Sequence, residues 1–262
     1  MNILVCIKQV PGTTKVEVDE KTGVLKRDGV ESKMNTYDLY AIETALQIRE
    51  KLQGKVTVLT MGPPQASEII KEAYMMGVDE GFLLTDRKFA GADVLATSYA
   101  LYQGIKAIGH FDLIICGKQT TDGDTAQVGP SLAELLQIPL VTWVTDIRYV
   151  DETKIILEQD MAESAVFLEV TYPCLITVEK DIMQPRLPSY KRKLQTAGKP
   201  VNILTFEDLS DKDETKYGLM GSATTVERIF PPPTDTEHVI WEGNAADLAD
   251  KMAETLKKLR FI

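Results

Sequence analysis

The chain has 262 residues, of which 44% are hydrophobic and 26% are charged, and its formal net charge is −10. This is enough apolar material for one large core, or for one core with an extension. The acidic balance argues against a nucleic-acid-binding protein, because affinity for a phosphate backbone requires a basic face.

No apolar run approaches the ~20 residues of a membrane span, so no membrane span is expected. The first residues, Met1 to Lys8, lack a basic leader and a cleavage site, and they predict a first strand rather than a signal peptide. Cys6, Cys116 and Cys174 are far apart and show no metal-ligand spacing. We therefore expect buried thiols in a reducing cytoplasm, and no metal site.

The N-terminal part alternates between apolar runs and turns. The run Ile3–Ile7 predicts a central strand, and residues 8–14 form the loop at its carboxyl end, where ligands bind in open α/β sheets. Residues 16–27 alternate, turn and return, which predicts a surface hairpin. Asn35 then fits the N-cap of a helix that ends at Gly54. The first turn of this helix either contacts a ligand or is simply capped.

The following segments keep the same rhythm of short apolar runs and helical stripes. The expected strands cover residues 56–60, 81–84 and 113–116, and the expected helices cover residues 65–76 and 91–108. This β–α–β–α order with helices of 10–15 residues predicts a doubly wound, mostly parallel sheet.

The most informative loop lies between the strand that ends at Cys116 and a helix that begins close to Gly129. Backbone N–H groups beside the positive end of a helix dipole bind phosphate in this position, although the loop is neither G-x-G-x-x-G nor a P-loop. Asp122 and Asp124 would repel phosphate, so they must point away, cap the helix or reach a ribose hydroxyl. The alternative is a solvated loop that caps the helix through Asp124. Pro130 is tolerated there only near the first helical turn.

After Pro139 the pattern changes to short strands with short turns. Residues 141–149, 154–158, 165–170 and 174–178 predict an antiparallel continuation of the sheet. Trp143 and Phe167 are expected in its core.

The last third of the chain is less regular. Residues 180–200 carry a local charge of +5, which indicates either a solvated charge run or a docking patch for an acidic or anionic partner. Residues 201–233 show little core of their own, whereas residues 245–259 recover a helical apolar stripe. We predict a nucleotide-binding α/β domain in residues 1–183, and in residues 184–262 a recognition loop and an arm that packs on another subunit.

No catalytic constellation is visible. His110 and His238 lie in unrelated contexts without a partnering nucleophile, and no catalytic residue is predicted. Any redox or transfer chemistry would therefore come from a bound cofactor.

Five segments together resemble the beta subunit of electron transfer flavoprotein, in order and at family-like spacing along the whole chain. They are Val5–Pro11, Met34–Asp38, Met61–Pro63, Gly117–Gly129 and Gln184–Arg186. The resemblance implies an adenine nucleotide alpha hydrolase-like fold and a heterodimer with a larger alpha subunit. An ATP-using synthetase or pyrophosphatase of the same fold is disfavoured, because S-G-G-x-D-S does not follow the first strand.

The resemblance also implies which residues bind cofactor and partner. The implied cofactor-binding residues are Cys6, Asn35, Thr36, Tyr37, Asp38, Met61, Gly117, Lys118, Gln119, Thr120, Thr121, Asp122, Gly123, Asp124, Thr125, Ala126, Gln127 and Val128. The implied recognition loop for a partner dehydrogenase consists of Leu187, Pro188, Ser189, Tyr190, Lys191, Arg192, Lys193 and Leu194.

Two subclasses of the family differ in the cofactor of this subunit. Ordinary members hold a structural AMP, whereas electron-bifurcating members hold a second FAD. The loop of this chain resembles the bifurcating group, and the small residues Gly123 and Ala126 leave room for a pyrophosphate near the backbone. Thr36 and Gly12 depart from the family's usual Pro and Asp, which affects the expected ribose contacts.

The resemblance to the electron-bifurcating subclass implies a route for electrons. NADH reduces the beta-subunit FAD, one electron passes to ferredoxin or flavodoxin, and the other passes through the alpha-subunit FAD to a flavin dehydrogenase of the acyl-CoA or hydroxy-acid type. In the alternative, the subunit holds AMP and only supports the FAD of the alpha subunit.

Overall fold

The computed structural model describes residues 1–12, 32–227 and 238–262. The described residues divide into two compact units, one of residues 1–12 with 32–227 and one of residues 238–262. The hairpin expected at residues 16–27 lies outside the described residues.

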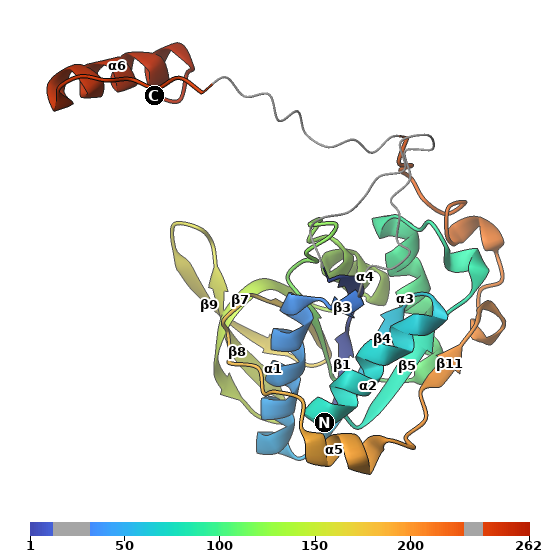
Figure 1. The fold of residues 1–262 in the computed structure, drawn as a ribbon. Helices are drawn as coiled ribbons and strands as arrows, with labels where there is room; N and C mark the ends of the chain where they lie inside the picture. The colour runs from blue at the N-terminus through green and yellow to red at the C-terminus, as the bar shows by residue number, and fades with distance from the viewer. Residues whose placement is uncertain (13–31, 228–237) are drawn as a thin grey trace. The chain divides into compact units, whose positions relative to one another are not determined.

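Within the described residues of the first unit, nine strands form one sheet in the order β11-β5-β4-β1-β6-β10-β7-β8-β9 (Figure 1). From β11 to β7, each strand is parallel to its neighbours. Strand β8 pairs antiparallel with β7, and β9 pairs antiparallel with β8. The strands are β1 (Asn2–Cys6), β4 (Lys55–Met61), β5 (Glu80–Leu84), β6 (Leu113–Gly117), β7 (Leu140–Val150), β8 (Lys154–Asp160), β9 (Ala165–Thr171), β10 (Cys174–Val178) and β11 (Asn202–Leu204). The mostly parallel, doubly wound sheet with an antiparallel extension is therefore confirmed.

Helices cover both faces of the parallel part. The helices of this unit are α1 (Thr36–Leu52), α2 (Ser67–Met76), α3 (Val94–Ile108), α4 (Val128–Leu136) and α5 (Tyr190–Thr196), with short 3-10 helices at Pro64–Ala66, Arg87–Phe89, Phe206–Asp208 and Glu214–Lys216. Ile3 and Val5 of β1 pack with α1 and α2, whereas Leu4 packs with α3 and α4. Because β1 is covered on both faces, it is apolar throughout rather than alternating.

The loop expected after β1 contains a strand of its own. Residues of β2 (Gln9–Pro11) pair antiparallel with β3 (Ser32–Met34) in a separate two-stranded ribbon. This ribbon leads directly into α1.

One predicted strand takes a different place and direction. The structure inserts β10 between β6 and β7, parallel to both, so its prediction as part of the antiparallel continuation was wrong. All five residues of β10 are buried. Such a fully apolar strand needs cover on both faces, which a central position provides and the half-exposed extension does not.

Residues 201–227 contribute more core than their sequence suggested. Strand β11 extends the sheet by pairing with β5, and Phe206, Leu209 and Tyr217 are buried on the face that α3 covers. The expectation of little core in this segment was therefore wrong. The boundary predicted at residue 184 falls inside the first unit.

Two aromatic residues expected in the core are exposed. Phe167 of β9 is 60% exposed and Trp143 of β7 is 39% exposed. Both lie in strands of the extension, and the helix contacts that cover the sheet involve mainly its parallel strands. The expectation that these two residues lie in the core was therefore wrong, and both contribute to the surface of the unit.

In the second unit, the described residues contain α6 (Ala245–Lys258), whose N-terminus is capped by the Asn244 side chain accepting from the Asp247 amide at 3.0 Å. Among all described residues, no helix is long and apolar enough to cross a membrane.

Candidate functional site

Three neighbouring parallel strands end at the same edge of the sheet. Cys6 ends β1, Met61 ends β4 and Gly117 ends β6. The chain winds from β1 towards β4 and β5 and then returns to β6 on the other side, so the β1–β6 junction is the point where the winding direction reverses. Ligands of open α/β sheets bind in the crevice at such a point.

Asn35 fastens the loop after β6 to the start of α1. It occupies the expected N-cap position, but its side chain does not cap α1. Instead its amide nitrogen donates to the Gln119 carbonyl at 2.9 Å, and its carbonyl accepts from the Thr121 amide at 3.2 Å. Because Asn35 is fully buried, these bonds set the position of the loop relative to the sheet.

Asp38 ties the ends of two strands together. Its carboxylate accepts from the Lys8 backbone amide at 2.7 Å and from the Asn35 side chain at 2.9 Å. The carboxylate also lies close to Gly117: a Cβ added to this glycine would be only 2.5 Å from Asp38 Oδ1. Burial raises the pKa of Asp38 to about 7, and the hydrogen bonds from Asn35 and Lys8 offset this only in part. Glycine at 117 is therefore required for the close approach of β6 to α1.

The two acids of the loop each have a hydrogen-bond partner, and the charge of Asp122 is balanced by a lysine. Asp122 accepts two hydrogen bonds from Lys8 Nζ, at 2.8 and 2.9 Å. Burial opposes ionisation of Asp122, but the bonds from Lys8 outweigh it and lower its pKa. Asp124 accepts from the side-chain amide of Gln119. The alternative that Asp124 caps α4 is wrong, since the N-cap residue is Gln127.

The loop leaves the start of α4 accessible. No side chain caps α4, and Pro130 lies in its first turn, where proline is tolerated. Asp124 and Ala126 have left-handed φ angles of 54° and 55°, which turn the loop sharply before the helix. Among the described residues other than its chain neighbours, the only heavy atom within 4 Å of a Cβ added at Gly123 would be Thr120 Oγ1, at 3.5 Å. The loop backbone and the helix N-terminus together can therefore receive an anionic group.

Lys118 begins the loop on the side of β10 and β7. Its ammonium lies 3.2 Å from Glu179 and 4.3 Å from the centre of the Trp143 ring. Trp143 itself adopts a left-handed φ of 56° at an irregularity of β7, where its amide donates to Thr177 Oγ1 at 3.0 Å. Lys118 is therefore held by side chains of the sheet.

The structure brings most of the predicted cofactor-binding residues to this edge. Thr36 and Tyr37 form the first turn of α1, and Tyr37 Cβ would lie 2.7 Å from a Cβ at Gly117. Of the loop residues after Gln119, several are exposed to solvent: Thr121, Asp122, Gly123, Asp124, Thr125 and Gln127. Sequence reasoning did not assign Lys8 to the site. A lysine directly after a central strand was the signal that could have indicated it.

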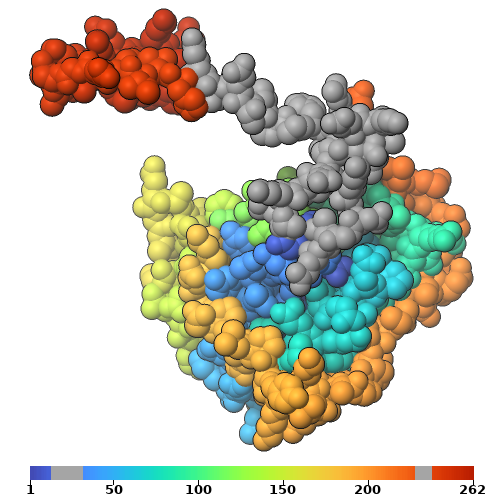
Figure 2. Space-filling view, viewed as in Figure 1, coloured from blue at the N-terminus to red at the C-terminus, as the bar shows by residue number. Residues whose placement is uncertain are grey.

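The predicted recognition loop lies at the opposite end of the parallel strands. The Ser189 amide donates to the Met75 carbonyl at 3.1 Å, so α5 begins against the C-terminal end of α2. Figure 2 shows this orange segment on the surface beside α2. The Arg192 guanidinium packs against Gly77. Arg186, just before the loop, forms ion pairs with Glu43 and Glu50 of α1.

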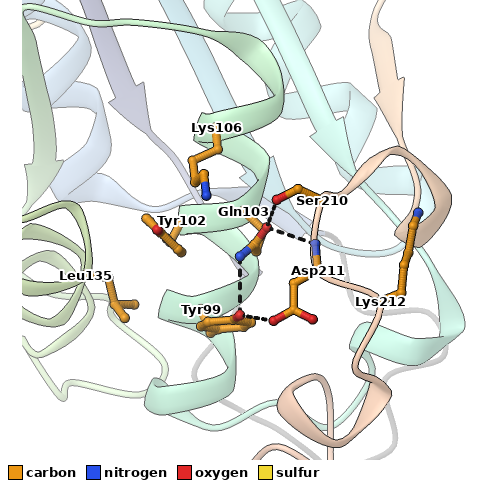
Figure 3. Close-up of a pocket in the computed structure, with 8 residues that line it drawn as sticks. All are labelled: Tyr99, Tyr102, Gln103, Lys106, Leu135, Ser210, Asp211 and Lys212. Carbon is orange, nitrogen blue, oxygen red and sulfur yellow. Dashed lines mark hydrogen bonds between the residues drawn. The ribbon is translucent and has the colours of Figure 1, made fainter.

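An open groove of about 670 Å³ lies elsewhere, along α3 (Figure 3). Its polar groups largely bond one another: Gln103 accepts from the Ser210 hydroxyl at 2.7 Å and donates to the Tyr99 hydroxyl at 3.3 Å. Tyr99 in turn donates to Asp211. These bonds attach Ser210 and Asp211 to α3, so we interpret the groove as a packing seam.

The fold and the strand-edge loops define a doubly wound α/β protein with a crevice at its reversal point. Residues 22–209 match the electron transfer flavoprotein domain, and the chain belongs to this family as a beta subunit.

The chain is similar over its full length to several curated proteins. It is 44% identical over 263 residues to the electron transfer flavoprotein subunit beta of Thermoanaerobacterium thermosaccharolyticum, with both chains fully covered. It is 42% identical to the caffeyl-CoA reductase-Etf complex subunit CarD of Acetobacterium woodii, also with full coverage. It is 40% identical to the protein FixA of Bradyrhizobium diazoefficiens, over 98% of this chain and 91% of the relative.

Proposed function

We propose that this chain holds FAD at the carboxyl ends of β1, β4 and β6 and works with an alpha subunit in flavin-based electron bifurcation. In this function the complex passes electrons from NADH to ferredoxin or flavodoxin. It also passes them through the FAD of the alpha subunit to or from a flavin dehydrogenase of the acyl-CoA or hydroxy-acid type.

The observation that carries the proposal is the loop fastened by Asn35. Lys8 balances the charge of Asp122, the side-chain amide of Gln119 donates to Asp124, and the loop leads into a helix N-terminus without a side-chain cap. A diphosphate fits this arrangement, because backbone N–H groups and a helix dipole favour negative charge. The bound flavin would supply one- and two-electron chemistry. The chain would bind its nucleotide part and fix the geometry of the loop.

One observation favours FAD over AMP, and a second concerns the partner. The space beside Gly123 and the sharp turn at Ala126 leave the loop backbone open to a group larger than a monophosphate. The similarity to CarD, whose name places it in a caffeyl-CoA reductase-Etf complex, points to a partner of the acyl-CoA type. The alternative is a subunit that holds structural AMP and supports only the FAD of the alpha subunit.

Cofactor stoichiometry of the purified alpha–beta complex tests the proposal. Chromatography of the released nucleotides should give two FAD and no AMP per complex. One FAD and one AMP would establish the alternative and remove the hydride-accepting role from this chain.

The variant Asn35→Ala assigns the second nucleotide to this chain. It removes both side-chain bonds to the loop, so we expect the complex to lose one FAD and to keep the other. The matched control is Asn202→Ala, because Asn202 lies on β11, where its amide contacts Glu80 at 3.4 Å. Full FAD content in Asn35→Ala would contradict the proposed site.

We also propose that residues 187–194 dock the partner dehydrogenase. Leu187, Tyr190 and Leu194 are 87%, 73% and 64% exposed, and the lysines 191 and 193 between them are exposed as well. Exposed apolar side chains ringed by one sign of charge are typical of a protein-binding surface. Arg192 is half-buried against Gly77 and anchors the loop rather than facing a partner.

Charge reversal at the loop tests this docking. The double variant Lys191→Glu/Lys193→Glu should lower the rate of electron transfer to the dehydrogenase at low salt, with a smaller effect at high salt. The double variant Lys55→Glu/Lys106→Glu changes the net charge equally at other exposed positions and serves as control. Equal rates for the two variants would contradict docking through this loop.

The helix α6 is proposed to pack on the alpha subunit. The apolar residues Leu248, Met252 and Leu256 of α6 and the C-cap residue Leu259 recur at helical spacing, and none of them is buried in the described structure. An amphipathic helix without a covered apolar face gains stability by packing on another chain. Truncation after residue 238 should therefore weaken association with the alpha subunit, as measured by analytical ultracentrifugation.

A further inference from the structure

Two of the three cysteines face each other across neighbouring strands. Cys6 of β1 and Cys116 of β6 are direct partners in the parallel register. Both contact the cluster formed with α3 and α4, so both side chains lie on the same face of the sheet. Cys174 belongs to the cluster on the other face.

The spacing of the two strands suits a covalent link. Neighbouring strands lie about 4.8 Å apart, which is inside the range of about 4.4–6.8 Å that a disulfide requires between Cα atoms. Hydrogen bonding to the Cys6 thiol, followed by burial, raises the pKa of Cys116 well above its usual value. The register and the shared face of the sheet place the two thiols beside each other. All three cysteines are free thiols in the structure.

We propose that Cys6 and Cys116 are an oxidisable dithiol, which hydrogen peroxide converts into an intramolecular disulfide beside the proposed nucleotide site. Cys6 is partly exposed and Cys116 is buried, so Cys6 meets the oxidant first. This inference goes beyond the proposed function, because no nucleotide takes part in the oxidation; a nucleotide bound against Cys6 should slow it.

The reaction has two balanced steps. The Cys6 thiolate attacks one oxygen of the peroxide, the O–O bond breaks, and a sulfenic acid and hydroxide form. The Cys116 sulfur then attacks the sulfenic sulfur, so that the S–S bond forms and the S–O bond breaks. The leaving hydroxide takes up the Cys116 proton and departs as water. Two thiols are oxidised by two electrons in total, and one peroxide is reduced to two waters.

The surroundings of the two thiols determine how fast the disulfide forms and which parts of the site it joins. The thiolate is the reactive form of cysteine, and the raised pKa of Cys116 keeps this thiol protonated, so the formation of the disulfide is slow. The rate of this step should increase as the pH rises. The pair is thus a stoichiometric target of oxidants rather than a peroxidase. The disulfide would join the strand ends directly before Lys8 and Gly117, the two residues that Asp38 holds together.

The test exposes the alpha–beta complex to millimolar hydrogen peroxide, alkylates the remaining thiols under denaturing conditions and analyses this chain by mass spectrometry. The wild type and the control Cys174→Ser should lose two hydrogen atoms and yield a cross-linked peptide pair containing Cys6 and Cys116. The variants Cys6→Ser and Cys116→Ser should form no internal disulfide. The peptide map of the wild type decides the question even if a variant folds poorly. Three alkylated cysteines, a disulfide through Cys174, or only sulfinic and sulfonic acids at Cys6 would overturn the proposal.

Discussion

The substitution Arg186→Ala should loosen the attachment of the recognition loop to the α/β unit. Arg186 Nε donates to Glu43 Oε2 at 2.8 Å and its Nη2 to Oε1 at 3.0 Å, while Nη1 donates to Glu50 at 2.7 Å. Only 4% of the Glu43 side chain is exposed, against 28% for Arg186 and 52% for Glu50. The variant therefore leaves a buried carboxylate with two remaining donors, Gln47 and the backbone of residue 186.

The expected cost follows from this burial. Removing one partner of a buried ion pair costs roughly 3–5 kcal/mol, and because Arg186 is partly solvated we expect the lower end, about 3 kcal/mol. Glu50→Gln removes only the exposed partner and should cost less than about 1 kcal/mol, so it is the control. The free energy of unfolding is measured by urea denaturation followed by circular dichroism.

The pH dependence adds a second check. Burial opposes ionisation of Glu43, but the bonds from Arg186 and Gln47 outweigh it and hold its pKa below the usual value. A lowered pKa in the folded state stabilises above the unfolded-state pKa, and this contribution is lost as the pH falls through the folded-state pKa. Without Arg186 the buried carboxyl can protonate instead, so the difference between wild type and variant should shrink from pH 7 to pH 4. A difference at pH 7 as small as that of Glu50→Gln would refute the reasoning.

Three further outcomes are expected. Gly117→Ala should destabilise the protein by about 1–3 kcal/mol, because its Cβ would lie 2.5 Å from Asp38 Oδ1; Gly123→Ala, with its nearest atom at 3.5 Å, is the control in the same thermal-unfolding assay. Burial raises the pKa of Asp38 to about 7, so between its ordinary pKa and about 7 the folded state binds a proton that the unfolded state has lost, and stability should fall as the pH rises through this window. Asp38→Asn should remove that slope, and an unchanged slope in urea denaturation at pH 5 and pH 8 would show that another group titrates. Tyr190→Ala/Leu194→Ala should reduce kcat/KM for electron transfer to the dehydrogenase by about tenfold without lowering the melting temperature, because both side chains are exposed; a fall in melting temperature instead would indicate a structural role.

The local pattern of apolar residues was sufficient to predict most strands and helices of the parallel sheet. Continuous apolar runs such as Ile3–Ile7 predicted strands covered on both faces, and the alternation with helical stripes predicted the doubly wound order. The same reasoning placed candidate residues at the strand ends, because the carboxyl ends of parallel strands share one edge. Periodicity did not reveal that β10 enters the sheet between β6 and β7, since an apolar run of five residues is compatible with any buried position.

The sequence by itself therefore determined the class of fold, the family resemblance and the loops from which a site can be built. These depend on residue type and spacing within short stretches. Only the tertiary structure decided which side chains meet: Lys8 with Asp122 across 114 positions, Asn35 with the loop across 84, and Arg186 with Glu43 across 143. Such contacts arise from the crossovers and the order of strands, which local periodicity does not encode. They balance the charge of Asp122, fasten the loop and anchor the recognition segment, and so they turn a set of candidate residues into an arrangement that can be tested.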